Sequence, residues 1–403
     1  MPSIEAASIR KILDSRGNPT VEVDLRAGRI LGRAAAASGA STGKHEPPAF
    51  PTGGVNEAVT VFRTVLAPRI TGRDIADQTG LDRALRQVDG TENFSRIGAN
   101  VATAVSIANA KAAAAAAREP LFVYLGGSKR VRMPLPFGNV IGGGRHAIGG
   151  TTIQEYMVVS QGPHVADNVF ANARVHRSVG DALTRRFPDE PLGRGDEGAW
   201  IARLKDEEAL ALLVDVCKSV GRDVGFPIRP ALDLAASEFY REGKYHYRDR
   251  SLTREGQIDL VERLVCEYDL FSVEDPFDQE DFGAFSELTT RIGDRCNVIG
   301  DDLFVTNVQR LQRGIDAGAG NAILIKPNQI GTLSDTRAAV DLAHKSGYTT
   351  VMSHRSGETT DDAIAHLAVA WGCLGIKTGA VGGERIAKLN ELIRIEEGLQ
   401  GGA

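Results

Sequence analysis

The chain has 403 residues with 42% hydrophobic and 25% charged side chains, a composition typical of a soluble globular protein. This length exceeds the roughly 250 to 300 residues that one core usually supports, so we expect two domains, at least one with a large core. The net charge of −5 is mild and no long run of lysine and arginine occurs, so we expect no nucleic-acid partner and only local binding of any anionic ligand.

The N-terminal third predicts a small α+β domain. Residues 18–37 alternate apolar and polar positions around Gly28, which indicates an antiparallel hairpin, and helical patterns follow at 55–66 and 98–118. The second helical pattern is rich in alanine but interrupted by polar residues, so we expect a soluble helix and no membrane span. Strands followed by helices suggest one domain over residues 1–129. The first residues lack a signal-peptide pattern.

From residue 130 onward, short apolar strands alternate with amphipathic helices. The six strand patterns begin at Ile228, Leu270, Asn297, Asn321, Thr349 and Leu374. The helical patterns between them span residues 256–268, 282–292, 307–318, 334–346 and 359–371, with Thr306 and Ser334 as expected N-caps. Each strand with its helix predicts a parallel-sheet unit.

A polar side chain marks the end of each of these strands. These residues are Asp233, Glu274, Asp301, Lys326, His354 and Lys377. The last four spacings between them, of 27, 25, 28 and 23 residues, each match one strand–helix unit. This regularity favours a (β/α)-barrel over residues 130–403, in which the strand ends share one rim. An open doubly wound sheet is the alternative, but it would spread the strand ends along a line.

Three of the expected rim residues are acids. Asp233, Glu274 and Asp301 would repel one another unless a cation or a proton joins them. Oxygen ligands favour Mg²⁺ first and Mn²⁺ next over zinc. Each acid taken singly could equally cap a helix or pair with a basic residue. The neighbouring Asp302 is expected to point to the opposite side of an extended chain.

Two lysines flank the expected metal. Lys326 alone is best explained as a solvated end-of-strand charge, but on a rim with Lys377 and acids it becomes a candidate for catalysis. Mutual repulsion and desolvation should lower the pKa of at least one lysine, which would make it a general base. A base beside a metal suits removal of a proton α to a carboxylate.

Two glycine-rich segments and one arginine complete the candidate site. In SHRSGET, Arg355 and Ser356 can bind a phosphate or a carboxylate, although an arginine paired with a structural acid is as common. GASTGKHE lacks the spacing of a phosphate-binding P-loop and is better explained as a mobile loop that brings Ser41 to the site. GGGRHAIGG is a second expected lid and carries His146.

The four cysteines are far apart in the sequence. None forms the close pair that a zinc site needs, so we expect buried thiols in a reducing compartment. The protein is expected in the cytoplasm.

Taken together, the chain resembles the enolase family over nearly its whole length. The motifs that carry the resemblance, in the family's order, are LDSRGNPTVE, SGAST, GDEG, SVEDPF, GDDLFVTN, KPNQIGT, SHRSGET and IKTG. The resemblance implies an α+β cap domain on a (β/α)8-type barrel with an irregular ββαα start. The implied reaction is reversible dehydration of 2-phosphoglycerate to phosphoenolpyruvate through an enediolate.

The resemblance also implies a role for each candidate residue. Asp233, Glu274 and Asp301 match the ligands of one magnesium, and Ser41 the lid ligand of a second. Lys326 matches the base, and Glu197 in GDEG the acid that assists loss of the β-hydroxyl, with Glu155 as its carboxylate partner. The remaining matches are His146 on the lid, Arg355 and Ser356 for phosphate, Lys377 for the substrate carboxylate, and Gln154 and His354 as supporting residues.

The sequence departs from the family's usual pattern at both lids. PPAFPTGG, residues 47–54, replaces an acidic stretch, and RHAIGG, residues 145–150, replaces SHAGN and adds Arg145, which is expected to be exposed. Three hypotheses follow: a housekeeping enolase, a paralogue such as a carboxyphosphonoenolpyruvate synthase in phosphonate biosynthesis, and a non-catalytic descendant. Glu22 and Arg394 match a family pair across a dimer interface, so a homodimer is implied.

Overall fold

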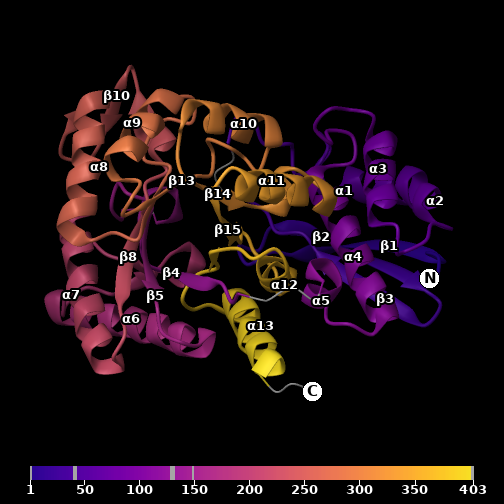
Figure 1. Ribbon diagram of the computed structural model, residues 1–403, viewed down its shortest axis with the longest axis horizontal. Helices are drawn as coiled ribbons and strands as arrows, with labels where there is room; N and C mark the ends of the chain where they lie inside the picture. The colour runs from indigo at the N-terminus through magenta and orange to yellow at the C-terminus, as the bar shows by residue number, and fades with distance from the viewer. Residues whose placement is uncertain (1, 40–42, 128–131, 148, 401–403) are drawn as a thin grey trace.

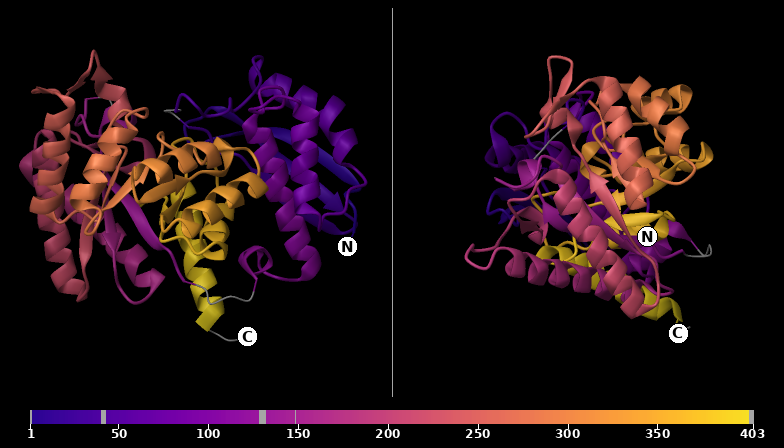
Figure 2. Two further views of the ribbon diagram at one scale, coloured as in Figure 1. Left: turned by 45° about the horizontal axis from the view of Figure 1, so that its top comes forward. Right: turned by 90° about the vertical axis from the view of Figure 1, so that its left-hand side faces the viewer.

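A computed structural model describes residues 2–39, 43–127, 132–147 and 149–400. An N-terminal α+β part and a barrel lie side by side in the views of Figures 1 and 2. The expected boundary at residue 129 falls outside the described residues. Within the described chain, no helix is long and apolar enough to cross a membrane.

The N-terminal part is a three-stranded antiparallel sheet covered by helices. Its strands are β1 (Ala6–Leu13), β2 (Pro19–Ala27) and β3 (Ile30–Ala35). Its helices are α1 (Gly54–Val61), η1 (Phe62–Leu66), α2 (Ala67–Ile70), α3 (Gln78–Asp89), α4 (Ala99–Ala117) and α5 (Leu121–Gly126). The expected hairpin and both expected helices are confirmed, whereas β1, α3 and α5 were not predicted. Helix α4 lies so close to β3 that a Cβ on Gly32 would be 1.9 Å from the carbonyl oxygen of Ala108.

The second part is a closed eight-stranded barrel. Its strands are β4 (Leu135–Gly142), β5 (Glu155–Ser160), β8 (Ile228–Asp233), β12 (Ser272–Glu274), β13 (Asn297–Gly300), β14 (Ala322–Ile325), β15 (Thr349–Ser353) and β16 (Gly375–Lys377). Pairing of β16 with β4 closes the sheet, so the open-sheet alternative is wrong. Strand β5 runs antiparallel to both neighbours, which places its first residue, Glu155, opposite Asp233, the last residue of β8.

Helices surround the barrel. They are α6 (Val165–Arg186), α7 (Asp206–Val224), α8 (Arg254–Tyr268), α9 (Phe282–Ile292), α10 (Val308–Ala317), α11 (Leu333–Lys345), α12 (Ala363–Ala370) and α13 (Gly383–Gln400). The order β4, β5, α6, α7 confirms the irregular ββαα start. Short elements occupy the loops: η2 (Gly144–His146), β6 (Gly193–Arg194), η3 (Asp196–Gly198), β7 (Trp200–Ile201), η4 (Ala236–Phe239), β9 (Tyr240–Arg241), β10 (Lys244–His246), β11 (Ser251–Leu252) and η5 (Pro327–Gln329).

The two expected N-caps are wrong by one or two residues. Asn307 caps α10 and Thr332 caps α11, each through a side-chain oxygen that accepts from the first turn. The hydroxyl of Thr306 instead donates to Gln329 at 2.7 Å, and that of Ser334 donates to Asp82 at 2.6 Å. Tertiary partners therefore hold the two residues that the local pattern assigned to caps.

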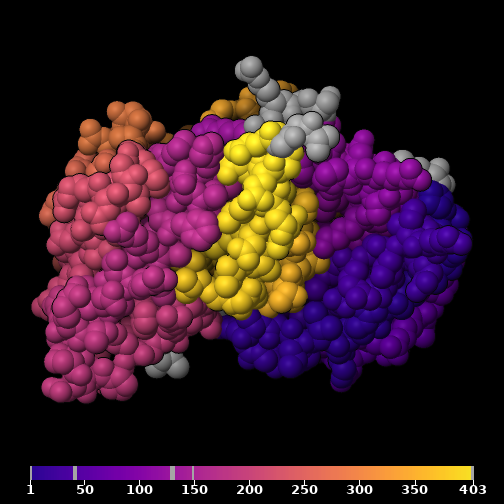
Figure 3. Space-filling model, turned by 90° about the horizontal axis from the view of Figure 1, so that it is seen from below, coloured from indigo at the N-terminus to yellow at the C-terminus, as the bar shows by residue number. Residues whose placement is uncertain are grey.

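Buried polar contacts join the two parts. Asp361, just before α12, accepts from Lys111 of α4 at 2.9 Å and from the backbone of Ala35 at 3.0 Å. Asp82 of α3 accepts from the backbone N–H of Ser334 at 3.0 Å. Figure 3 shows the C-terminal helix α13 on the surface between the barrel and the N-terminal part.

We predict that Asp361→Asn destabilises the protein by about 2 to 3 kcal/mol, because it removes the nearer of the two acids that pair with Lys111 and leaves only Asp362, at 3.7 Å. This loss of stability is at or below the low end of the loss expected for a fully buried ion pair, because the Lys111 side chain is 23% exposed. The midpoint of urea unfolding measures the change. Asp341→Asn removes an exposed pair with Arg337 and should change stability by less than about 0.5 kcal/mol. Equal effects in the two variants would contradict the argument.

The same pair should make stability depend on pH. Burial raises the pKa of Asp361, but Lys111 and the backbone donors outweigh it, so the folded pKa is lowered. The stabilisation is therefore present above the unfolded value of about 3.9 and is lost as pH falls through the folded pKa. The difference in free energy of unfolding between wild type and Asp361→Asn should therefore become smaller below about pH 4.

Candidate active site

Most of the candidate residues line one cavity of about 30 Å³ at the rim of the barrel. They are His146, Gln154, Glu155, Glu197, Asp233, Asp301, Lys326, His354, Arg355, Ser356 and Lys377. Glu274 lies next to this group through its contact with Lys377, and Ser41 lies outside the described residues. The predicted convergence of strand ends is thus found for all six rim residues. The cavity has room for about two water molecules.

Lys377 is the central cation of the site. Its Nζ lies 2.9 Å from Asp233 Oδ2, 2.8 Å from Glu274 Oε2 and 3.3 Å from Glu155 Oε1. Burial lowers the pKa of Lys377, but the carboxylates, Asp233 first, raise it well above its usual value. Burial and the charge of Asp233 raise the pKa of Glu274. This ammonium therefore stays charged and joins acids from three strands.

Lys326 pairs with the third acid of the rim. Its Nζ lies 2.5 Å from Asp301 Oδ2, and Gln329 donates to Asp301 Oδ1 at 2.9 Å. Burial lowers the pKa of Lys326, yet Asp301 outweighs burial and raises it. The expectation that repulsion lowers the pKa of a rim lysine is wrong for this arrangement of charges, because each lysine has nearer carboxylates than lysines.

Asp302 does not point away from the site. Carboxylate oxygens of Asp275, Asp301 and Asp302 lie within 4.8 Å of one another. The strand ends at Gly300 and the chain turns, so the alternation expected for an extended segment does not apply. Asp275 accepts from the backbone N–H groups of Asp301 and Asp302, at 2.9 and 2.7 Å. Burial and the neighbouring Asp301 raise the pKa of Asp275.

The donor chemistry of this side of the site suits a hard divalent cation. Asp233, Glu274 and Asp301 end adjacent strands, and all their donor atoms are carboxylate oxygens, which Mg²⁺ and Mn²⁺ prefer. Burial and the neighbouring acids raise the pKa values of Glu274 and Asp275, which a bound cation would oppose. The residues therefore fit a site for a hard divalent cation.

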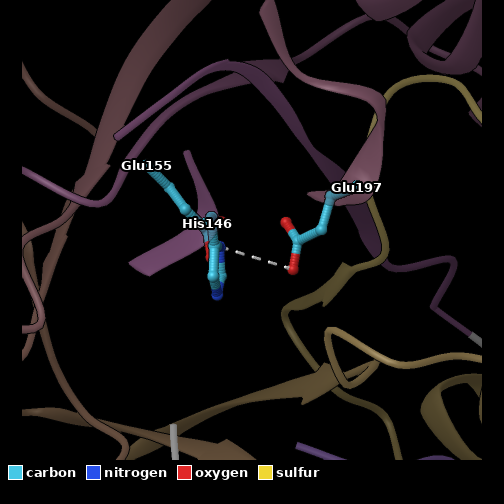
Figure 4. A group of neighbouring side chains, drawn as sticks. All are labelled: His146, Glu155 and Glu197. Carbon is cyan, nitrogen blue, oxygen red and sulfur yellow. Dashed lines mark ion pairs between the residues drawn. The ribbon is translucent and has the colours of Figure 1, made fainter. Parts of the chain in front are cut away.

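Glu197 faces the cavity from a loop rather than from a strand. It lies in η3 with a positive φ of 65°, a strained conformation for a residue with a side chain. Asn139 donates to Glu197 Oε2 at 3.0 Å. In Figure 4, His146 lies between Glu155 and Glu197, with Nδ1 at 3.3 and 3.9 Å from their nearest oxygens. These three residues are buried, and burial raises the pKa of Glu155.

His354 is oriented by an arginine that sequence analysis missed. Arg385 of α13, fully buried, donates to His354 Nδ1 at 2.9 Å and to the carbonyl oxygens of Arg355 and Ser356 at 2.6 Å each. Because a guanidinium only donates, Nδ1 must be the acceptor and Nε2 carries the proton. That Nε2 lies 3.2 Å from Glu197 Oε1. The spacing of GGERIAKLN gave no periodic signal for this role.

The protonation of Glu197 is tied to these histidines. Burial raises its pKa, but His354, His146 and Arg385 outweigh burial and hold the pKa of Glu197 well below its usual value. Burial lowers the pKa of His354 to about 4 and also lowers that of His146. Glu197 is therefore a carboxylate in this arrangement and must take up a proton before it can act as an acid.

Arg355 is held by a second residue that sequence analysis missed. Glu46, from the loop after the expected lid serine, lies 2.8 Å from the Arg355 guanidinium, and Asn328 accepts from it at 2.8 Å. Glu46 also accepts from Gln329 at 3.2 Å. The N-terminal part thus contributes a carboxylate to the rim. The motif GKHE contains Glu46, but nothing in the sequence placed it against Arg355.

An ion pair holds the second expected lid at its exposed edge. Arg145 in η2 lies 2.6 Å from Glu238 in η4, with a side chain 58% exposed. The expectation that Arg145 is exposed is confirmed. The contact joins the segment that carries His146 to the loop that follows Asp233.

Comparison with known proteins gives a consistent family. Residues 4–125 match the family model "Enolase, N-terminal domain", and residues 130–403 match "Enolase, C-terminal TIM barrel domain". The chain is 54% identical to a protein named Enolase from Natronomonas pharaonis, with 98% of this chain and 99% of that protein covered. It is 50% identical to Enolase from Methanothermobacter thermautotrophicus, with 98% and 96% covered.

We predict that Glu274→Gln weakens Mg²⁺ binding at least tenfold, about 1.4 kcal/mol, because an amide lacks the charge of a carboxylate. Isothermal titration calorimetry of the purified chain measures the affinity. Glu397→Gln removes an exposed acid of α13 and should leave the affinity within twofold. Unchanged binding in Glu274→Gln would remove this residue from the ligand set.

Proposed function

The chain belongs to the enolase family, and from that membership we propose how its residues divide the dehydration of 2-phosphoglycerate to phosphoenolpyruvate. The protein is a hydro-lyase of the phosphopyruvate hydratase type. The observation that supports the division is that Lys326 and the two buried glutamates, Glu155 and Glu197, line one cavity. Elimination needs this arrangement, since a proton leaves one carbon and hydroxide leaves the next.

Lys326 is the proposed base. Its Nζ takes the proton from C2, and the electron pair of that bond passes toward the substrate carboxylate to give the enediolate. Lys326 must first be neutral, which its burial favours and its pairing with Asp301 opposes. Mg²⁺, held by Asp233, Glu274 and Asp301, would neutralise these acids and stabilise the charge of the enediolate. Asp301 is then a weaker counter-charge for Lys326.

Glu197 is the proposed acid. It donates a proton to the hydroxyl on C3, which departs as water while the C2–C3 double bond forms. Glu155 and His146 lie against it and limit its loss of that proton to water. Asn139 donates to one of its oxygens, and His354 Nε2 lies 3.2 Å from the other. The electrons from the C2–H bond thus complete the elimination without free hydroxide.

The substrate's anionic groups divide between the remaining cations. Arg355 and Ser356 are proposed to bind the phosphate, and Lys377 the carboxylate, with Gln154 as support. Arg355 suits phosphate because its planar donors can make two parallel hydrogen bonds. To do so it must exchange Glu46 for the phosphate.

The finer features of the family complete the proposal. We propose two Mg²⁺ ions per site, the second on Ser41, a cytoplasmic location, and a homodimer that involves Glu22 and Arg394. Within the chain, Glu22 pairs with Arg10 and Arg394 with Glu391. The paralogue and the non-catalytic hypotheses are not favoured, because relatives named Enolase match the whole chain at about 50% identity.

A direct assay tests the reaction. Purified protein with Mg²⁺ and 2-phosphoglycerate should form phosphoenolpyruvate, followed by its ultraviolet absorbance. Lys326→Ala should slow exchange of the C2 hydrogen with deuterated solvent by about 10³-fold, the scale of a lost general base. Mg²⁺ affinity and the circular dichroism spectrum report whether the variant is folded. Lys345→Ala, an exposed lysine of α11, is the matched control and should exchange normally. Retained exchange in Lys326→Ala would refute the base assignment.

Glu46 should compete with the substrate phosphate for Arg355. We predict that Glu46→Gln lowers the KM for 2-phosphoglycerate about fivefold, the equivalent of about 1 kcal/mol of lost ion pairing. Steady-state kinetics at fixed Mg²⁺ measures it. Glu280→Gln is the matched control, since Glu280 pairs with His45 of the same loop at the exposed edge. A higher KM in Glu46→Gln would show that Glu46 orients Arg355 instead of competing for it.

A further inference from the structure

Three arginines surround a second cavity, far from the barrel rim. Arg69, Arg73 and Arg96 line a depression of about 240 Å³ on the N-terminal part, about eight times the volume of the rim cavity. We call it the arginine pocket. Arg69 lies in α2, Arg73 follows this helix, and Arg96 comes from the loop after α3. Figure 1 places α2 and α3 at the end of the molecule opposite α7 and α8.

The pocket has positive charge without compensation. Within the described chain, no acidic side chain lines it, and none of its three arginines forms an ion pair within 4.0 Å. This is unusual for the protein, whose net charge is −5 and whose other arginines often have acid partners. Arg86, on the same helix α3, binds Asp335 at 2.8 Å. Three guanidinium groups around one depression repel one another unless an anion joins them.

Main-chain contacts hold two of these side chains in place. Arg73 Nε donates to the carbonyl oxygen of Arg69 at 3.1 Å, and Arg96 donates to that of Val88 at 3.2 Å. Asp89, buried beneath the loop, accepts from the backbone N–H of Arg96 at 3.0 Å and so fixes where that residue lies. Each guanidinium keeps further N–H groups with no acceptor among the described residues. The donors are thus partly pre-organised, which reduces the entropy lost when a ligand binds.

The rest of the lining limits the kind of ligand. Val65, Ala84 and Val88 supply an apolar wall and Gln87 an amide, so the pocket is not a uniformly charged surface. A guanidinium matches the oxygens of a phosphate, and three of them suit an anion with more than one phosphate group. A single carboxylate would leave most of the positive charge unbalanced.

We propose that the arginine pocket binds a small anion with two or more linked phosphate groups. This site is separate from the catalytic rim and is not part of the proposed reaction. Free polyphosphates and nucleoside polyphosphates share the required chemistry.

Calorimetric titration with pyrophosphate tests the proposal. The full chain is used with EDTA present, so that metal does not recruit phosphate to the barrel rim. Wild type should bind one pyrophosphate with Kd below 1 mM. The double variant Arg69→Gln/Arg96→Gln should bind at least tenfold more weakly, with its unfolding temperature in the absence of ligand and its turnover of 2-phosphoglycerate unchanged.

The matched control removes the same charge elsewhere. Arg177→Gln/Arg185→Gln alters two exposed arginines of α6 and should keep the affinity within twofold. An equal loss of pyrophosphate affinity in both double variants would mean a general charge effect. Wild-type affinity in Arg69→Gln/Arg96→Gln would place pyrophosphate elsewhere on the protein. Either result overturns the proposal, and so does the absence of binding at 1 mM pyrophosphate. Titration with ATP and tripolyphosphate separates the sources. If ATP binds tenfold more tightly than tripolyphosphate, the ligand is a nucleotide whose base uses the apolar wall. If the two affinities are equal, the ligand is a polyphosphate chain.

Discussion

The site depends on the balance of charge buried at the rim of the barrel. Lys377 and Lys326 are each held by carboxylates from neighbouring strands, and neither side would be stable there alone, since an isolated buried charge costs several kcal/mol. Barrel closure brings these partners together, because β16 carries Lys377 back beside β4 and the acids of β5, β8 and β12. The architecture and the charge distribution therefore support each other.

A second set of cations organises the loops around this rim. Arg385 binds the backbone of the segment that carries His354 and Arg355, and Lys388, one turn further along α13, lies 2.6 Å from Glu358 and donates to the carbonyl oxygen of Thr359 at 2.5 Å. Both cations are almost wholly buried. The C-terminal helix thus acts as a scaffold for the phosphate side of the site, although it contributes no residue to the proposed proton transfers.

The features that could be predicted from the sequence are those that follow from the regular alternation of strands and helices. The rim residues follow apolar strands at nearly constant spacing, so their convergence could be inferred before any coordinates. Residues such as Glu46 and Arg385 lie on a loop and a helix whose position depends on tertiary packing, and no local pattern places them. The predictions for Asp302, Thr306 and Ser334 were wrong for a related reason, because partners distant in the sequence determine the contacts of these three side chains. The rim lysines were candidates for a general base from the sequence pattern, but the choice of Lys326 and the roles of Glu197 and Glu155 came from the family resemblance.

The contacts between the N-terminal part and the barrel differ in kind. Asp82 and the pair Lys111–Asp361 join helices through buried groups that no substrate would touch, so they fix the relative position of the two parts. Glu46 reaches the barrel through Arg355, the group that the substrate phosphate would use. Exchange of the ion pair between Glu46 and Arg355 would therefore free the Arg355 guanidinium while the buried contacts of Asp82 and Lys111 stay in place. The N-terminal part can thus keep its position on the barrel while Glu46, on a loop, is replaced at Arg355 by another negatively charged group, the substrate phosphate.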